Sequence, residues 1–481
     1  MMRRETDALG DLLLTENAYY GIQTERARKN FDISGQTYER FPDFIWCIAA
    51  IKKAAALANA RTGALDKEIA DAIGQAADEI MSGKMKDQFP IDIFQGGGGT
   101  SINMNVNEVI ANRANELLMG EKGYSRVHPN THVNMCQSTN DVIPSAIKMT
   151  CHIYLKKLIK SIDVLEQALR IKTDEFKDVV KLGRTCLQDA VPITLGQEFS
   201  GYLGFIMRQK QTLENLMDTC LDIPLGATAI GTGIGTVPGY VENVYMFLSD
   251  ITGIPVRKEK NYFDALQNGD FYIYVSTGLK ALATGLSKMA TDFRLLSSGP
   301  RAGINEINLP AVQPGSSIMP GKVNPVMPEL VNQVCYQVCG NDLAVTMAVE
   351  GGELDLNVWE PVIAKCLFES FMLLANSILL FSEKCVMGIT ANKERCRTYA
   401  VSSLALSTVI AARAGYKTGS RVAEYASERN LSIKEAAVEM NILAAEEAEK
   451  LFDPMLLTDS EKSGKEIPKD IHGIPERSGN S

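Results

Sequence analysis

Three long stretches of this chain carry apolar side chains at alternating steps of three and four residues. That spacing places the side chains on one face of an α-helix, as in the seam of a coiled coil. Convincing alternation of strands and helices is absent, so the pattern predicts an all-α chain built around an extended bundle of long helices. We expect the same helices of neighbouring subunits to cover part of each seam. The seam positions are Leu155, Leu158, Ile162, Leu165 and Leu169; Leu279, Leu282, Leu286, Met289, Phe293 and Leu296; and Leu367, Phe371, Leu374, Ile378, Phe381 and Cys385.

Changes in this pattern divide the 481 residues into three expected domains. Residues 1–140 form an N-terminal helical domain, irregular to about residue 45 and followed by an Ala-rich helical run to Ile80. Residues 141–392 form the central bundle. Residues 393–481 form a small C-terminal helical domain with a capping box at Ser432-Ile433-Lys434-Glu435, and the polar stretch after Asp459 predicts a frayed tail.

The charge balance excludes a general role in binding nucleic acid. With 49 basic and 58 acidic residues the formal net charge is −9, so any site for an anion must be local. The 45% of apolar and 22% of charged residues are typical of a soluble globular protein. No signal peptide or long apolar span is evident, and we expect no membrane partner.

Cysteine and histidine usage predicts a cytoplasmic protein without a metal. The ten cysteines contain no C-x-x-C pair, which favours reduced thiols. Cys335 and Cys339 lie one helical turn apart and offer half of a metal site, but small buried hydrophobic residues explain them better. The four histidines lack an H-E-x-x-H motif or a carboxylate cluster. We expect neither a catalytic metal nor a cofactor.

The stretch from Pro314 to Pro325 has the composition of a mobile catalytic loop. Its prolines and glycines exclude a helix or a central strand. Gly315 and Gly321 allow backbone N–H groups to turn toward a ligand. The side chains of Ser317, Lys322 and Asn324 suit the binding of carboxylates, which leaves Ser316 as the candidate reactive group.

Two other interpretations of this loop fail, and a third stays open. A nucleotide-binding loop requires four residues between its glycines, whereas five separate Gly315 from Gly321. Neither serine lies in a G-x-S-x-G or S-x-x-K motif of a hydrolase. A surface loop without a function remains the alternative.

Further polar stretches of the sequence contain candidate ligand-binding residues. Four glycines precede Thr100 and Ser101, where a flexible linker is the alternative. The stretch Gln137-Ser138-Thr139-Asn140-Asp141, with Pro144 in the expected first turn, predicts the start of a long helix. Such a start can bind a carboxylate, although helix capping alone also explains it. Gly231-Thr232-Gly233-Ile234-Gly235 lacks the spacing of a dinucleotide site.

These motifs together resemble the fumarase/aspartase superfamily. The loop matches the pattern G-S-S-x-x-P-x-K-x-N, and the chain also carries Gly-Gly-Gly-Gly-Thr-Ser, Gln-Ser-Thr-Asn-Asp and Gly-Arg-Thr in the order that this superfamily uses. The resemblance extends from Ala18-Tyr19-Tyr20-Gly21 to at least Asn392. It implies an all-α homotetramer that releases fumarate from a succinyl compound, with each active site built from three subunits.

The resemblance also implies roles for individual residues. Ser316 matches the general base, which removes a proton to form an aci-carboxylate intermediate. The expected leaving-group side carries Cys186, where fumarases and some aspartases have histidine. The residues that match substrate contacts are Thr100, Ser101, Ser138, Thr139, Asn140, Thr185, Ser317, Lys322 and Asn324.

Within the superfamily, two activities compete. Gln137-Ser138-Thr139-Asn140-Asp141 and Leu356-Asn357-Val358-Trp359-Glu360-Pro361 resemble the ammonia-lyases that act on aspartate, whereas Val127-His128-Pro129-Asn130 resembles the class II fumarases. Cys186 counts against a fumarase, whose chemistry is thought to need an imidazole there. The resemblance therefore favours reversible deamination of L-aspartate. Hydration of fumarate is the alternative, and a catalytically silent bundle protein is a third hypothesis.

Overall fold

The computed structural model describes residues 2–467, and helices make up most of them. These residues form two compact units. Unit 1 contains the residues up to Ser161, Gln209–Thr284 and Val334–Asn376, and unit 2 contains Ile162–Arg208, Gly285–Gln333 and the residues from Ser377 onward. The chain thus passes from one unit to the other several times, always inside a helix. The expected division into three domains stays a prediction.

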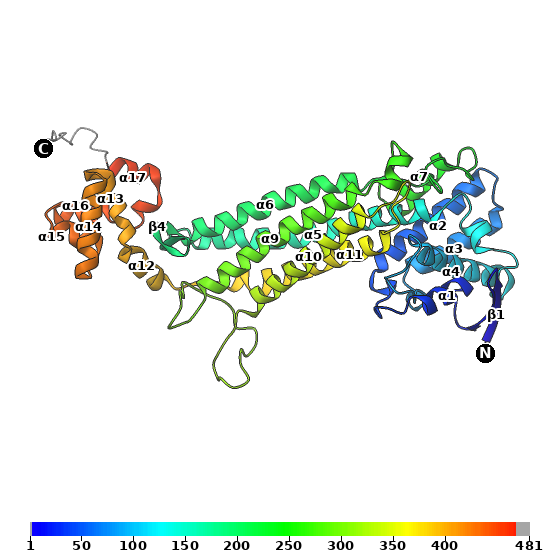
Figure 1. The fold of residues 1–481 in the computed structure, drawn as a ribbon, viewed down its shortest axis with the longest axis horizontal. Coiled ribbons are helices and arrows are strands. Elements are labelled where there is room, and N and C mark those ends of the chain that lie inside the picture. Colours follow the sequence, from blue (N-terminus) through cyan, green and yellow to red (C-terminus); the bar gives the residue numbers. More distant parts are fainter. Residues whose placement is uncertain (1, 468–481) are drawn as a thin grey trace. The chain divides into compact units, whose positions relative to one another are not determined.

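Five long helices contribute residues to both units. In each unit their segments lie side by side, which confirms the all-α bundle predicted from the sequence (Figure 1). The five are α5 (Thr139–Glu175), α6 (Leu195–Thr219), α9 (Asp270–Leu296), α10 (Val326–Glu350) and α11 (Glu360–Lys384).

The apolar seams of these helices are buried within a single chain. None of the seam positions on α5, α9 and α11, nor Cys385 just after α11, is more than 6% exposed. In unit 2, for example, the ring of Phe293 stacks at 5.4 Å on Phe199 and at 5.7 Å on Phe381. The expectation that neighbouring subunits cover these seams is therefore wrong, because helices of the same chain already fill them.

One segment has the length and composition of a membrane span, contrary to the sequence-based expectation. It runs from Glu360 to Gly388 and includes α11. However, 56% of its most apolar window is buried inside the protein, and its seam residues face other helices. The apolar character of α11 is that of a helix in the core of a bundle.

The N-terminal region is more regular than the sequence suggested. Strands β1 (Met2–Asp7) and β2 (Gly10–Thr15) form an antiparallel hairpin, and α1 (Ile22–Asn30) follows. The Ala-rich run is two helices, α2 (Pro42–Arg61) and α3 (Lys67–Met81), because Gly63 between them has a left-handed φ of +79°. Helix α4 extends over Thr100–Met119, and thus begins directly after the four glycines.

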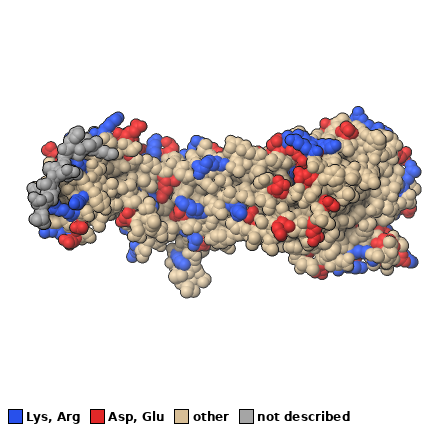
Figure 2. Space-filling model, turned by 45° about the horizontal axis from the view of Figure 1, so that its top comes forward, with Lys and Arg blue, Asp and Glu red and all other residues tan. Residues whose placement is uncertain are grey.

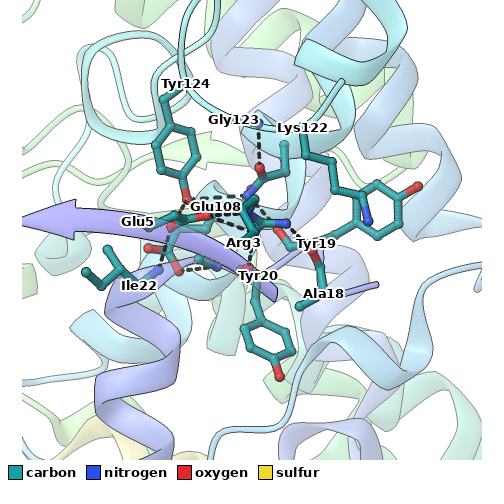
Figure 3. A network of polar contacts seen from close by, with 12 residues as sticks. Arg3, Glu5, Ala18, Tyr19, Tyr20, Ile22, Glu108, Lys122, Gly123 and Tyr124 are labelled. Atoms are coloured by element: carbon teal, nitrogen blue, oxygen red, sulfur yellow. Dashed lines mark hydrogen bonds and ion pairs between the residues drawn. The ribbon is translucent and has the colours of Figure 1, made fainter. Parts of the chain in front are cut away.

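A buried carboxylate fixes the segment after this hairpin to α4 (Figure 3). The carboxylate oxygens of Glu108 accept hydrogen bonds from the backbone N–H groups of Gly21, Gln23 and Thr24 and from the Thr24 hydroxyl. Burial raises the pKa of Glu108 to about 7. A Cβ atom on Gly21 would lie 2.0 Å from the hydroxyl oxygen of Tyr124, so this position admits only glycine. Unit 1 therefore has a rigid anchor at α4.

The remaining elements are short. Capping at Ser432 is confirmed, because its hydroxyl accepts from the Glu435 N–H while the Glu435 carboxylate accepts from the Ser432 N–H. The predicted frayed tail begins with a helix instead, and its last residues, 468–481, lie outside the described part. These elements are β3 (Val180–Thr185), β4 (Gln188–Thr194), β5 (Asp222–Ile223), α7 (Tyr240–Thr252), β6 (Arg257–Lys258), α8 (Tyr262–Gln267), β7 (Ile307–Asn308), β8 (Thr390–Ala391), α12 (Lys393–Ser402), α13 (Ser407–Ala414), α14 (Tyr416–Arg429), α15 (Ile433–Glu439), α16 (Ala445–Leu451) and α17 (Ser460–Glu466).

Charged side chains of both signs are mixed on one face of the molecule. On the face drawn in Figure 2, lysine and arginine are interspersed with aspartate and glutamate. This distribution agrees with the small negative net charge of the sequence. Any selective site for an anion therefore depends on local groups.

Candidate active site

The catalytic loop predicted between Pro314 and Pro325 is irregular and exposed over most of its length in unit 2. Its shape comes from hydrogen bonds between loop residues. The Gly315 N–H donates to the Lys322 carbonyl at 2.8 Å, and the Asn324 side-chain amide donates to the Gly315 carbonyl at 2.7 Å. A Cβ atom on Gly315 would lie 2.6 Å from the Lys322 carbonyl oxygen, so the closure of this loop requires glycine.

The hydroxyl of Ser316 faces two backbone N–H groups. Its Oγ accepts from the N–H of Ile318 at 3.2 Å and from the N–H of Met319 at 3.0 Å. Both donors would stabilise a negative charge on this oxygen more than they stabilise the neutral hydroxyl. The arrangement is the one that a serine needs in order to act as a base.

The loop borders a cavity of about 570 Å³ in unit 2. Two of the predicted carboxylate-binding residues, Lys322 and Asn324, line it, together with Arg294 from the end of α9 and Glu329 from α10. Sequence reasoning missed Arg294, because its neighbours belong to an ordinary helical pattern. Two cations and one carboxylate leave this cavity suited to an anionic ligand.

Thr185 and Cys186 lie at the tip of a second element of unit 2, the β3–β4 hairpin. Thr185 pairs with Gln188 across a two-residue turn, in which Cys186 (φ 53°) and Leu187 (φ 60°) both have left-handed backbones. Two positive φ angles are the pattern of a type I′ turn, for which Asn-Gly is the usual sequence signal. The hairpin was missed for that reason, and its tip exposes the side chains of Thr185 and Cys186.

A buried ion cluster holds the base of this hairpin. Glu306 is fully buried, and its Oε2 lies 2.9 Å from Nη1 of Arg184 and 3.0 Å from Nζ of Lys181. Lys181 also pairs with Glu198 at 2.8 Å. Because Glu306 neutralises the Arg184 guanidinium, the residue of the Gly-Arg-Thr motif that is free to meet a ligand is Thr185.

The other predicted contacts lie at the start of α5, in unit 1. Ser138 caps this helix, since its Oγ accepts from the Asn140 N–H at 3.2 Å. Capping, which the sequence offered as an alternative to ligand binding, is thus present and leaves the hydroxyl proton of Ser138 unused. The Asn140 side chain donates to the Ala229 carbonyl at 2.7 Å. Pro144 lies in the second turn rather than the first, because the helix already begins at Thr139.

Asp141 connects this helix start to a distant loop. Its carboxylate accepts from the backbone N–H groups of Ser138, Gly226 and Thr228, at 2.9, 3.0 and 3.0 Å. Burial raises the pKa of Asp141 to about 6. Sequence patterning assigned Asp141 only to helix capping, and could not show that it also fixes residues 226–228.

The starts of α4 and α5 lie against each other. A Cβ atom on Gly99 would lie 3.1 Å from the Ile143 side chain in α5. The side-chain amide of Asn103, one turn into α4, donates to the Thr139 hydroxyl oxygen at 3.1 Å. Thr100 precedes Asn103 by three residues and therefore lies on the same face of α4. The structure thus brings Thr100 toward Ser138, Thr139 and Asn140, whereas Ser101 is only partly exposed beside it.

A buried lysine lies beneath these helix starts. Nζ of Lys52 donates to Oδ1 of Asn134 and to Oε1 of Gln137, both at 2.9 Å. Burial lowers the pKa of Lys52 to about 7. We call the helix-start cluster the set Lys52, Thr100, Asn103, Asn134, Gln137, Ser138, Thr139, Asn140 and Asp141.

The predicted site residues thus fall into groups on separate segments. The helix-start cluster belongs to unit 1, and the loop and the hairpin tip belong to unit 2. Their functional roles stay predictions. Among residues 2–467, no group of three or more His, Cys, Asp and Glu side chains is arranged to hold a metal ion.

Comparison with known proteins identifies the family. A model of the family described as "Lyase" matches residues 10–340, which is more than half of the chain. The chain belongs to this lyase family. A model described as "Fumarase C C-terminus" matches residues 406–459 of this lyase.

Relatives that match this lyase over nearly its whole length include several aspartate ammonia-lyases. An aspartate ammonia-lyase of Bacillus sp. is 47% identical over 95% of this lyase and 97% of the relative. An aspartate ammonia-lyase of Escherichia coli (strain K12) is 45% identical over 94% and 95% of the two chains.

Solved structures share the fold of this lyase. A fumarate lyase:delta crystallin of Brucella melitensis bound to cobalt is 45% identical, with a TM-score of 0.92 over 95% of this chain and 100% of that one. A class II fumarase of Schistosoma mansoni is 36% identical, with a TM-score of 0.92 over 95% and 99%. The resemblance inferred from the sequence motifs is confirmed.

Proposed function

We propose that this lyase is an aspartate ammonia-lyase, which deaminates L-aspartate reversibly to fumarate and ammonia. The observation that carries the proposal is the 45–47% identity to aspartate ammonia-lyases over nearly the whole chain. The loop geometry supports it, since the reaction needs a base and groups that bind two carboxylates.

Ser316 is the proposed base. Its alkoxide takes a proton from the β-carbon of aspartate, and the electron pair moves into the β-carboxylate to give an aci-carboxylate dianion. The backbone N–H groups of Ile318 and Met319 donate to the Ser316 Oγ, and hydrogen bonds to a charged oxygen are stronger than those to a neutral hydroxyl, so both donors favour the alkoxide. Lys322 on the same loop adds a positive charge.

The dianion collapses when the bond between carbon and nitrogen breaks. The amino group of aspartate is an ammonium at neutral pH, so it leaves as neutral ammonia with the electron pair of that bond. It therefore needs no proton donor, whereas hydroxide would need one. Cys186 in place of histidine fits this difference, and it is the reason why we favour aspartate over malate as the substrate.

The family resemblance supports the remaining contacts that we propose. We assign the β-carboxylate to Thr100, Ser138, Thr139 and Ser317, where donors and helix starts can stabilise extra charge. Lys322 and Asn324 bind the α-carboxylate. Ser101, Asn140 and Thr185 complete the proposed set of contacts.

Association into a homotetramer with shared sites is part of the proposal. Large apolar side chains on α9 and α10 are exposed in the single chain, with Tyr274 at 61%, Leu343 at 61% and Met347 at 66%. Such side chains suit an interface between long helices. The ten cysteines form no disulfide among the described residues, which supports a reducing, cytoplasmic location.

One assay tests the activity. The purified protein is incubated with L-aspartate or with L-malate, and the ultraviolet absorption of fumarate is followed. We expect absorption to rise with aspartate and not with malate. A signal from malate alone would assign the protein to the fumarases, and no signal from either substrate would contradict both activities.

A further inference from the structure

We propose that Asn103 is a positioning residue that forces the Thr139 hydroxyl to donate its hydrogen bond toward the substrate. Asn103 is almost fully buried, and it lies behind the helix start rather than in contact with a ligand. This inference rests on the proposed activity, and in particular on the contact between Thr139 and the β-carboxylate.

The hydrogen bonds at Asn134 show which end of its side-chain amide is the oxygen. In its charged form the Lys52 side chain has only N–H donors to offer to the two oxygens that it touches, at 2.9 Å each, and its neutral form still has one N–H for each of them. The Asn134 atom at this contact must therefore be its oxygen, Oδ1. The other end of the Asn134 amide agrees, because its Nδ2 donates to the Gln137 carbonyl at 3.1 Å.

The orientation of Asn134 determines that of Asn103. The Asn103 amide group lies 3.3 Å from Oδ1 of Asn134, which has no proton, so Asn103 must present its NH₂ group there. The same NH₂ group lies 3.1 Å from the Thr139 hydroxyl oxygen. Thr139 is therefore an acceptor at this contact, and the orientation follows from the Lys52 end of the chain.

Because the Thr139 hydroxyl oxygen accepts a hydrogen bond from Asn103, its own proton points away from Asn103. Among residues 2–467 the structure shows no acceptor for the Thr139 proton, and the side chain is partly exposed. The proton is thus available to a carboxylate bound at the helix starts. Donors fixed in advance toward developing charge stabilise a transition state more than freely rotating donors do.

Asn107 provides a matched control. It lies one turn further along α4 and donates to the same Oδ1 of Asn134, at 3.1 Å. Like Asn103 it is buried, with an unpartnered Oδ1, but no hydrogen bond joins it to Thr139. The two asparagines thus differ in the contact that the inference invokes.

The test compares four variants in the full-length protein: Asn103→Leu, Asn107→Leu, Thr139→Val and the double variant Asn103→Leu/Thr139→Val. We expect Asn103→Leu to lower kcat for aspartate by about 10–100-fold, less than the roughly 10²–10³-fold for removal of a preorganised donor because the Thr139 hydroxyl remains, with a much smaller change in KM. Asn107→Leu should keep kcat within about threefold at a similar melting temperature. The double variant should be no slower than Thr139→Val, because Asn103 acts through that hydroxyl.

Two outcomes would overturn the inference: equal losses of kcat in Asn103→Leu and Asn107→Leu, or additive losses in the double variant. If Asn103→Leu does not fold, Asn103→Asp tests the same point, because its carboxylate would accept the Thr139 proton. We expect that variant to lose at least as much kcat, and a rate like that of the wild type would contradict us. A wild-type protein that releases no fumarate from aspartate would instead refute the proposed activity.

Discussion

The helix-start cluster and the loop between Pro314 and Pro325 both carry groups that we assign to the substrate, but they are built in opposite ways. In the cluster, buried side chains from several elements fix one another, as Lys52, Asn134 and Asn103 do. In the loop, the bonds that shape the chain join loop residues to each other, and most of its side chains are exposed. We therefore infer that the cluster is held rigidly by its own contacts, and we expect the loop, which has few contacts outside itself, to be the more mobile of the two.

The largest expected effect is the loss of kcat on substitution of Ser316, which should leave the stability of the protein unchanged. Ser316→Ala should lower kcat by about 10²–10⁴-fold, the usual contribution of a general base, because the variant has no hydroxyl to ionise. Its melting temperature should equal that of the wild type, since the hydroxyl bonds only within the loop. Fumarate release and thermal unfolding measure the two effects. Turnover within tenfold of the wild type would remove Ser316 from its proposed role.

The second prediction concerns the buried charge of the cluster. Burial lowers the pKa of Lys52 from its ordinary 10.5 to about 7, so the unfolded chain holds the proton more tightly between these values. The free energy of unfolding should therefore fall as pH decreases from 10.5 to 7, and change little from this cause below pH 7. Lys52→Met removes this dependence, which amounts to roughly 1.4 kcal/mol for each pH unit in that range.

Denaturant unfolding at pH 7, 8 and 9 measures the difference between the wild type and Lys52→Met. The control is Lys53→Met, at the next position of α2, where Nζ pairs with Asp78 and the side chain is 23% exposed. We expect the curve of stability against pH to change slope only in the Lys52 variant. Parallel curves for all three proteins would show that the cluster holds no titrating charge in this range.

The third prediction concerns binding by the loop. Lys322→Ala should raise KM for aspartate by about 10–100-fold, because a charge-assisted hydrogen bond to a carboxylate contributes about 1.5–3 kcal/mol. Steady-state kinetics with the wild type and with Lys417→Ala, an exposed lysine of α14 outside the site, provide the comparison. An unchanged KM in the Lys322 variant would show that the α-carboxylate binds elsewhere.

The smallest loss of kcat is expected on substitution of Gly321, where an added Cβ atom would have no neighbour. Gly321 has a φ of +82°, and a Cβ atom there would contact nothing within 4 Å. The only expected cost of Gly321→Ala is backbone strain near ~1 kcal/mol, so kcat should change by less than about tenfold. Gly315→Ala should cost more, because its Cβ would lie 2.7 Å from the Asn324 N. Kinetics of both variants test this order. Equal losses would mean that crowding at Gly315 does not limit the loop.

The sequence predicted those features that depend on neighbours along the chain. The spacing of apolar residues from Leu155 to Leu169 predicted both the helix α5 and its buried face, because the helical period determines which side chains share a face. The composition of the stretch Pro314–Pro325 gave an irregular loop. The left-handed turn at Cys186 and Leu187 escaped prediction, because neither residue is the asparagine or glycine that usually signals such a backbone.

The sequence by itself determined the helical bundle, the family and the residue types that we propose as substrate contacts, because local periodicity and short motifs carry that information. Only the tertiary structure decided what covers the seams and how Lys52 orients Asn103 through Asn134. These features depend on groups separated by tens of residues, and their distances and hydrogen-bond directions are set when the chain packs.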